Sequence, residues 1–348
     1  MIKKRNTLFD SLKGIGMIGI LLIHFGYWYN LSDYLHPYIF KIVSKADYGV
    51  ELTFIINALL LTYSFNKNCH TKGQSLVLFI LSQFRKIIFI YYFSLLVKII
   101  VDCTASASLD YSLGNIISHF LFVNTIKPEY FNSLFGGSGY IGVIAIMWII
   151  YPILLKIFNT KKKSYILFST FFTVCYCLYM YVIYRYHPAN KHVWLVEFLY
   201  FIRAFISYSI GNLLSYFLLD KKQNLGKFIV WFVSIMSIIV FAFSIYCGQD
   251  NPFLFVAIIS LVIYFNYNEP IMLIDNPLFA FIGKHIFSIF IGHILGLYIL
   301  QRIGCPTTIT TAIMNFILIF PISLILEKLV NKPFQSLLFS KRKENKSS

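Results

Sequence analysis

Long, uninterrupted apolar runs separated by short polar segments are the main pattern in this chain. Runs of about twenty apolar residues can cross a bilayer as helices, and these runs lack the alternation of a membrane β-strand. The pattern therefore predicts an all-α, polytopic membrane protein, a bundle of about ten transmembrane helices. The ten predicted spans are 8–29, 48–65, 76–101, 139–158, 164–184, 194–219, 228–247, 252–267, 281–301 and 309–330.

The connections between the runs are short and show no internal repeat and no separate soluble domain. The longest connection, 102–138, contains the apolar stretch IISHFLFV, which predicts either a surface helix or a re-entrant segment. The first run is too long for a signal-peptide core and has no small-residue cleavage site, so we expect it to remain as a helix. We predict one transmembrane domain over 1–335 and a basic cytoplasmic tail over 336–348.

Basic residues decide the expected orientation, because cytoplasmic segments of membrane proteins carry an excess of Lys and Arg. With ten spans and the N-terminus inside, the cytoplasmic segments hold 18 Lys and Arg and the opposite segments hold 6. A topology of nine spans would place the basic C-terminal segment outside. We therefore expect cytoplasmic N- and C-termini in a multi-pass protein of the plasma or inner membrane of a cell.

The composition supports lipid as the surrounding medium, since 58% of the residues are hydrophobic and only 13% are charged. The net charge of +16 could indicate nucleic acid, but the basic residues gather between the apolar runs. We therefore expect membrane lipid and no nucleic acid as a partner. The six cysteines lack zinc-like spacing, and no metal-binding, phosphate-loop or serine-nucleophile motif occurs, so no metal is expected.

Three ionisable residues, Asp10, Lys13 and His24, lie within the first apolar run or at its edge. Such groups are costly in a spanning helix, so they usually face a protein interior or a wet cavity. Asp10 and Lys13 are three residues apart and can pair on one face. Lys13 and His24 are eleven residues apart, which puts them on nearly the same face, about 16 Å apart along the axis. This spacing indicates that Lys13 and His24 are the two ends of one polar path along the helix.

Arg85 and Lys86 add two further positive charges near the predicted cytoplasmic end of the third run. Together with Lys13 they could form a basic pocket for a phosphorylated donor, because Arg and Lys both pair with phosphate. The alternative is that these long side chains extend to lipid headgroups.

Two histidines lie deep within apolar runs, His24 in the first and His293 in the ninth. Imidazole can remove a proton from a hydroxyl group near neutral pH, so both are candidate catalytic residues. The alternative for each is a hydrogen-bonded packing residue.

Two of these patterns resemble motifs of the family-3 membrane acyltransferases, the integral-membrane O-acetyltransferases that modify cell-surface sugars. In the first span the family has an aspartate, a basic residue and, after ten intervening residues, a histidine, and Asp10, Lys13 and His24 match it. The segment FRKIIFIYY resembles the family's basic segment, with Lys86 in the arginine place and Phe89 in place of a proline.

Two later segments add to the resemblance, which spans nearly the whole chain. The segment RAFISYSIGNLL resembles the family's arginine-to-glycine segment through Arg203, and FIGKHIFSIFIGH resembles a family motif that ends at His293. The chain departs from the family at Asn57-Ala58, where many members have Ser-Gly, and at Ile144, where many have glutamate.

The resemblance implies a membrane O-acetyltransferase that moves an acetyl group from acetyl-CoA to a hydroxyl of a cell-surface or exopolysaccharide sugar or its lipid-linked precursor. Lys13, Arg85 and Lys86 would hold the donor's phosphates, and His24 would act as base or relay the acetyl group. His293 would be a second catalytic residue. Asp10 and Arg203 would have structural or substrate-positioning roles.

Four questions stay open at the level of sequence. Acetylation could use a polar path from Lys13 to His24 across the membrane, or act on a precursor before its export. A transporter or exporter of lipid-linked sugar without enzymatic activity would need similar polar residues, and consumption of acetyl-CoA would distinguish the two classes. The acceptor sugar and the oligomeric state stay open as well.

Overall fold

The computed structural model describes residues 7–105, 111–186, 193–220, 227–246, 252–267 and 270–334. Within these ranges the chain is built of helices, turns and loops without a strand, which confirms the all-α prediction. The predicted tail 336–348 lies outside the described residues. The α-helices are α1 (Thr7–Trp28), α2 (Pro37–Val43), α3 (Gly49–Phe65), α4 (Leu76–Phe84), α5 (Ile88–Ala105), α6 (Leu113–Phe120), α7 (Ser138–Ile157), α8 (Lys161–Tyr186), α9 (Val193–Asp220), α10 (Lys227–Tyr246), α11 (Pro252–Asn266), α12 (Pro277–Lys284), α13 (Ile286–Arg302) and α14 (Ile309–Ile325).

The helices are long and apolar, as a membrane protein requires. Within the described residues, six helical segments are long and apolar enough to cross a membrane, or seven if the bent pair α12–α13 forms one span. The apolar segments Phe228–Val240 and Leu254–Asn266 are shorter. A protein with several apolar membrane helices is therefore confirmed, whereas the count of ten and the cytoplasmic ends stay predictions.

Two of the predicted spans are broken in the structure. The run 76–101 is divided into α4 and α5 by a tight turn, in which Lys86 N donates to Gln83 O at 3.0 Å. The run 281–301 bends by 79° between α12 and α13. Both halves of each run are apolar, and a polar pair stands at each break, Arg85-Lys86 in the first run and Lys284-His285 in the second.

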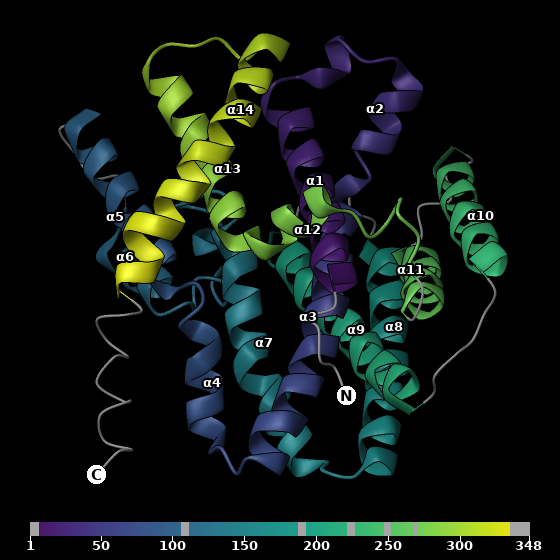
Figure 1. Cartoon of the computed structure of the whole chain (residues 1–348). Helices are drawn as coiled ribbons and strands as arrows, with labels where there is room; N and C mark the ends of the chain where they lie inside the picture. The colour runs from purple at the N-terminus through teal and green to yellow at the C-terminus, as the bar shows by residue number, and fades with distance from the viewer. Residues whose placement is uncertain are drawn as a thin grey trace.

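The helix α1 lies at the centre of the arrangement that positions the polar residues. It begins in the middle of the view, where it meets α12 and the beginning of α3, and runs toward the top (Figure 1). Glycines permit this close approach, because a Cβ on Gly283 would lie 1.7 Å from Asp10 O and one on Gly49 would lie 2.2 Å from Gly16 O. Small residues at helix contacts let backbones touch in this way, which fixes α1 against its neighbours.

Buried polar side chains join α3, α7 and α9 on another side of the core. Tyr151 Oη lies 2.5 Å from Thr62 Oγ1 and accepts a hydrogen bond from Asn212 Nδ2 at 3.1 Å. Asn57 Nδ2 donates to Tyr208 Oη at 2.7 Å. Polar groups inside an apolar bundle must satisfy one another, so these bonds fix the three helices in one arrangement.

The apolar stretch in the 102–138 connection forms the short helix α6. Eight residues at 1.5 Å each are too few to span a bilayer. Its His119 is fully buried, with Nδ1 at 3.2 Å from Tyr91 Oη and Nε2 at 3.5 Å from Ser133 Oγ. This segment therefore packs tightly onto α5.

Candidate functional site

The helix α1 carries three of the predicted site residues, Asp10, Lys13 and His24. Asp10 lies near its beginning and is buried, and Lys13 Nζ lies 3.9 Å from Asp10 Oδ1. The side chain of Lys13 is 22% exposed. The predicted pairing of Asp10 and Lys13 is thus present, and the backbone contact between Asp10 and Gly283 holds this turn of α1 against α12.

Lys13 and Lys86 line one cavity of about 110 Å³, which we call the lysine cavity. Their repulsion within one cavity favours an anionic occupant. Lys86 comes from the turn between α4 and α5, and its Nζ donates a hydrogen bond to Gln83 Oε1. The remaining residues that line the lysine cavity are Met17, Ile20, Thr53, Phe54, Asn57, Tyr140, Ile141, Ile144, Trp148, Ile286, Phe287 and Phe290.

Arg85, the third predicted cation, is exposed, as is Lys86, but of the two only Lys86 is among the described residues that line the lysine cavity. The tight turn after α4 separates the directions of the two neighbouring side chains. The structure thus brings together two of the three cations predicted to converge.

Two of the positions where the sequence departs from the family resemblance lie at the same cavity. Asn57 and Ile144 both belong to its wall. An apolar isoleucine therefore takes the place that many family members give to a carboxylate, which makes this part of the wall less polar.

His24 and His293 meet although they are 269 residues apart in the chain. His293 Nε2 lies 3.2 Å from His24 Nδ1, and Trp28, one turn after His24, stacks on the His293 ring with centroids 5.4 Å apart. His293 is fully buried, whereas His24 is partly exposed. Asn315 Nδ2 donates to the backbone carbonyl of His293 at 3.2 Å, which fixes this turn of α13.

His24 lines a second cavity of about 240 Å³, which we call the histidine cavity. Ile20, Tyr140 and Phe290 belong to the walls of both cavities, so the two cavities adjoin. The residues that line the histidine cavity are Ile20, Ile23, His24, Tyr27, Asp47, Val50, Phe131, Asn132, Gly137, Tyr140, Tyr200, Arg203 and Phe290.

Arg203, the predicted positioning residue, enters the histidine cavity from α9 between two carboxylates. Its Nε donates to Glu51 Oε1 on α3, and its Nη2 donates to Asp47 Oδ2 at 3.1 Å. The side chain of Glu51 is 2% exposed and that of Asp47 is 34% exposed. This buried ion triad fixes the wall, because a desolvated charge is tolerated only when it is paired.

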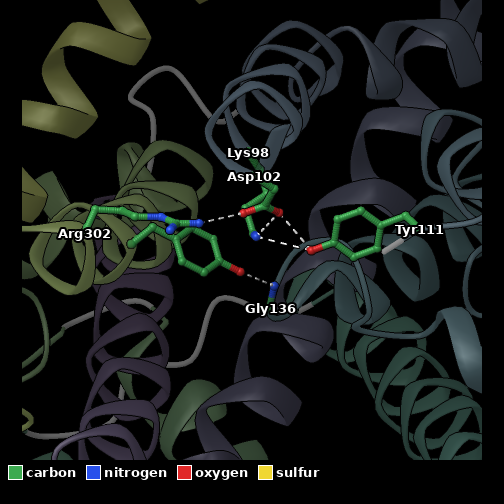
Figure 2. Close-up of polar contacts among 6 residues, drawn as sticks. Lys98, Asp102, Tyr111, Gly136 and Arg302 are labelled. Carbon is green, nitrogen blue, oxygen red and sulfur yellow. Dashed lines mark hydrogen bonds and ion pairs between the residues drawn. The ribbon is translucent and has the colours of Figure 1, made fainter. Parts of the chain in front are cut away.

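A second polar cluster fixes the loop that completes the histidine cavity (Figure 2). Asp102 on α5 accepts hydrogen bonds from Lys98, from Tyr111 Oη at 2.8 Å and from Arg302 Nη2 at 3.3 Å. Next to it, Gly136 N donates to Tyr298 Oη at 3.4 Å. These contacts tie α5 and α13 to the segment 111–137, which supplies Phe131, Asn132 and Gly137 to the cavity wall.

Sequence reasoning missed several residues of this site. Asp47 precedes Glu51 by four residues, a spacing that places both on one helical face, and this was the available signal. Trp28 follows His24 at the same spacing. The contact of Asn315 with His293 has no sequence signal, because it depends on the packing of α14 on α13. Within the described residues, no group of three or more His, Cys, Asp or Glu could hold a metal ion.

Comparison with known proteins gives one match. Residues 6–328 match a family model described as an acyltransferase domain, of the family-3 type, which covers nearly the whole chain. Neither the comparison with curated proteins nor that with solved structures gives a match.

Proposed function

Since the chain belongs to the family-3 acyltransferases and is a membrane acyltransferase, we propose that it transfers an acetyl group from acetyl-CoA to a sugar hydroxyl. The acceptor is a cell-surface or exopolysaccharide sugar or its lipid-linked precursor. The lysine cavity receives the donor and the histidine cavity receives the acceptor.

The adjoining cavities are the observation that carries this proposal. Lys13 and Lys86 line the lysine cavity, and His24, which contacts His293, lines the histidine cavity. Three side chains belong to both walls and lie between the two spaces: Ile20, Tyr140 and Phe290. An acyl group bound at the first space is thereby close to a nucleophile bound at the second. A transporter without enzymatic activity has no comparable support from the family match.

The lysine cavity fits one end of the donor. Pockets that enclose a whole drug-sized ligand measure roughly 300–1,000 Å³, so 110 Å³ holds the acetyl thioester end and leaves the nucleotide outside. Lys13 and Lys86 then attract the phosphates toward the mouth. Arg85, exposed beside Lys86, contacts the nucleotide only from outside the cavity.

His24 is the proposed general base. In the tautomer that serves this role, His24 Nδ1–H donates to His293 Nε2 across 3.2 Å, and His24 Nε2 keeps its lone pair for the acceptor hydroxyl proton. The hydroxyl oxygen bonds to the acyl carbon as its proton moves to His24. The C–S bond then breaks, and His24 returns the proton to the leaving thiolate of coenzyme A.

A relay through His24 is the alternative order of the same steps. His24 Nε2 attacks the thioester first, the C–S bond breaks, and the Nδ1 proton of His24 passes to the leaving thiolate. The acceptor hydroxyl later takes the acetyl group from Nε2 and gives its proton back to the ring. Both orders balance, and they differ in whether acetylated His24 forms without an acceptor. His293 holds the His24 ring in either order.

We further propose the topology that the basic residues predict, ten spans with both termini cytoplasmic in the plasma or inner membrane of the cell. Residues 1–335 then form the transmembrane acyltransferase domain, and 336–348 form its tail. In this topology Lys13 and Lys86 lie toward the cytoplasm, where acetyl-CoA is present.

Glycan analysis of cells with and without the gene tests the proposed function. Surface glycans and lipid-linked precursors from both strains are compared by mass spectrometry before and after mild alkali, which removes O-acetyl esters. An alkali-labile increment of one acetyl group that depends on the gene supports the proposal. Identical glycans in both strains, or glycans that are absent from the surface rather than deacetylated, would contradict it.

A further inference from the structure

We propose that Asp47 and the Arg203 ion triad select the charge of the acceptor, so that the histidine cavity accepts neutral or cationic sugars and rejects anionic ones. Asp47 is the acceptor-positioning residue. This inference rests on the proposed function, since it concerns the sugar that enters the same cavity.

The guanidinium of Arg203 is already engaged by carboxylates on this protein. Nε is taken by Glu51 and Nη2 by Asp47. The single positive charge of Arg203 is outweighed by the two carboxylates, so an anionic acceptor that approaches its remaining N–H groups also meets Asp47 beside them. Arg203 therefore does not act as an anion receptor but fixes the two acids.

Asp47 is the acid that meets the acceptor. Glu51 is almost completely enclosed and does not line the cavity, whereas Asp47 lines the cavity and is one-third exposed. Arg203 bonds to Asp47 through Oδ2, and Oδ1 has no partner among the described residues. A carboxylate oxygen in this position accepts a hydrogen bond from a hydroxyl or an ammonium group.

The two cavities have net charges of opposite sign, negative beside the histidine cavity and positive at the lysine cavity. Glu51, Asp47 and Arg203 sum to one negative charge beside the histidine cavity, while Lys13 and Lys86 line the lysine cavity. Like charges placed together are strongly unfavourable in a space with little water. The histidine cavity thus repels an anionic sugar.

The remaining wall suits a sugar ring. Asn132 Oδ1 accepts a hydrogen bond from Gly139 N at 3.0 Å, which leaves the Asn132 Nδ2 group as a donor. Tyr27 and Tyr200 add aromatic surface. A few oriented polar groups among aromatic side chains are typical of small-molecule sites, and here they match hydroxyl groups rather than a carboxylate.

Three model acceptors that share one ring test the inference on the full chain in lipid nanodiscs. Methyl glucopyranoside is neutral, methyl glucopyranosiduronate carries a carboxylate, and methyl glucosaminide carries an ammonium group. With acetyl-CoA as donor, O-acetylated product is measured by mass spectrometry. We expect the kcat/KM of the neutral and cationic sugars to exceed that of the uronate by about tenfold or more, because a like-charge contact is avoided.

The variant Asp47→Asn keeps an oxygen for Arg203 but removes the charge. It should reduce the preference for the neutral over the anionic sugar several-fold, while Asp47→Glu retains the preference and the KM for acetyl-CoA stays unchanged in both. Equal use of all three sugars by the wild type, or an unchanged preference in a folded Asp47→Asn protein, would overturn the inference alone. Consumption of acetyl-CoA without acetylation of any sugar would reject the sugar acceptor and the inference with it.

Discussion

The histidine pair supports a prediction in which two neighbouring substitutions have very different effects. His24→Ala removes the proposed base, and a positioned general base contributes roughly 10²–10⁴-fold to rate. His293→Phe removes one hydrogen bond to His24 Nδ1, at 3.2 Å, but keeps a ring against Trp28. A hydrogen bond contributes about 0.5–1.5 kcal/mol, which corresponds to about 2–13-fold in rate. We therefore expect the first loss to exceed the second by at least about eightfold.

The assay measures the two losses under one set of conditions. Each variant is reconstituted in nanodiscs with saturating acetyl-CoA, and the initial rate of sugar acetylation is followed by mass spectrometry. The KM for acetyl-CoA and the thermal midpoint of each preparation serve as controls, since neither residue lines the lysine cavity. Incubation with donor alone, followed by peptide mass spectrometry, detects acetylated His24 if the relay order operates.

Two results would refute this reasoning. A folded His24→Ala protein with full activity removes His24 from the chemistry. If His293→Phe loses as much transfer activity as His24→Ala, His293 does more than hold the neighbouring ring. If His24→Ala is active and His293→Phe is inactive, His293 is the base.

Three other predictions concern the donor, pH and topology. Lys86→Ala should raise the KM for acetyl-CoA about tenfold or more, since a charge-assisted contact contributes about 1.5–3 kcal/mol. Arg85→Ala should change this KM less than about fivefold, because Arg85 is not among the described residues that line the cavity; equal effects would contradict the cavity assignment. Burial lowers the pKa of His119 from 6.5 to about 4, so the unfolded segment binds protons more readily. The contribution of neutral His119 to the free energy of unfolding is therefore fully present above pH 6.5, and up to about 3 kcal/mol of it is lost as the pH drops toward 4. Hydrogen exchange of 113–137 should become faster over this pH range, and His119→Gln should abolish this pH dependence. Reporter fusions after Lys341 and within 102–138 should report opposite sides of the membrane, and signals from one side would overturn the ten-span topology.

Some features of the site could be predicted from local spacing alone. The apolar runs indicate membrane helices because lipid is the only medium that covers so much apolar surface. The pairing of Asp10 with Lys13 follows from their separation of three residues within one helix. Lys13 and His24 lie on α1 and reach two adjoining cavities because helical periodicity places both on nearly one face.

Other features depend on packing that no local pattern encodes. The turn after Phe84 directs Lys86 into the lysine cavity and leaves Arg85 outside, although the two residues are adjacent and chemically alike. The contact between His24 and His293 joins α1 to α13 across most of the chain. The pairing of Asp47 with Arg203 requires α9 to pack on α3, which the resemblance at Arg203 does not describe.

The central claim is that the acetyl group passes between the two adjoining cavities, and Ile20 lies in both walls. Ile20→Phe places a larger ring there, at a stability cost of about 1–3 kcal/mol for overpacking, and Ile20→Val is the matched control that leaves the passage open. The measurement is the rate of acetyl transfer from acetyl-CoA to methyl glucopyranoside in nanodiscs, with donor binding determined on the same preparations. The account predicts that folded Ile20→Phe binds acetyl-CoA but transfers acetyl at least about tenfold more slowly than Ile20→Val, a loss within the range that misplaced reactants suffer. Equal transfer by the two folded variants would contradict it.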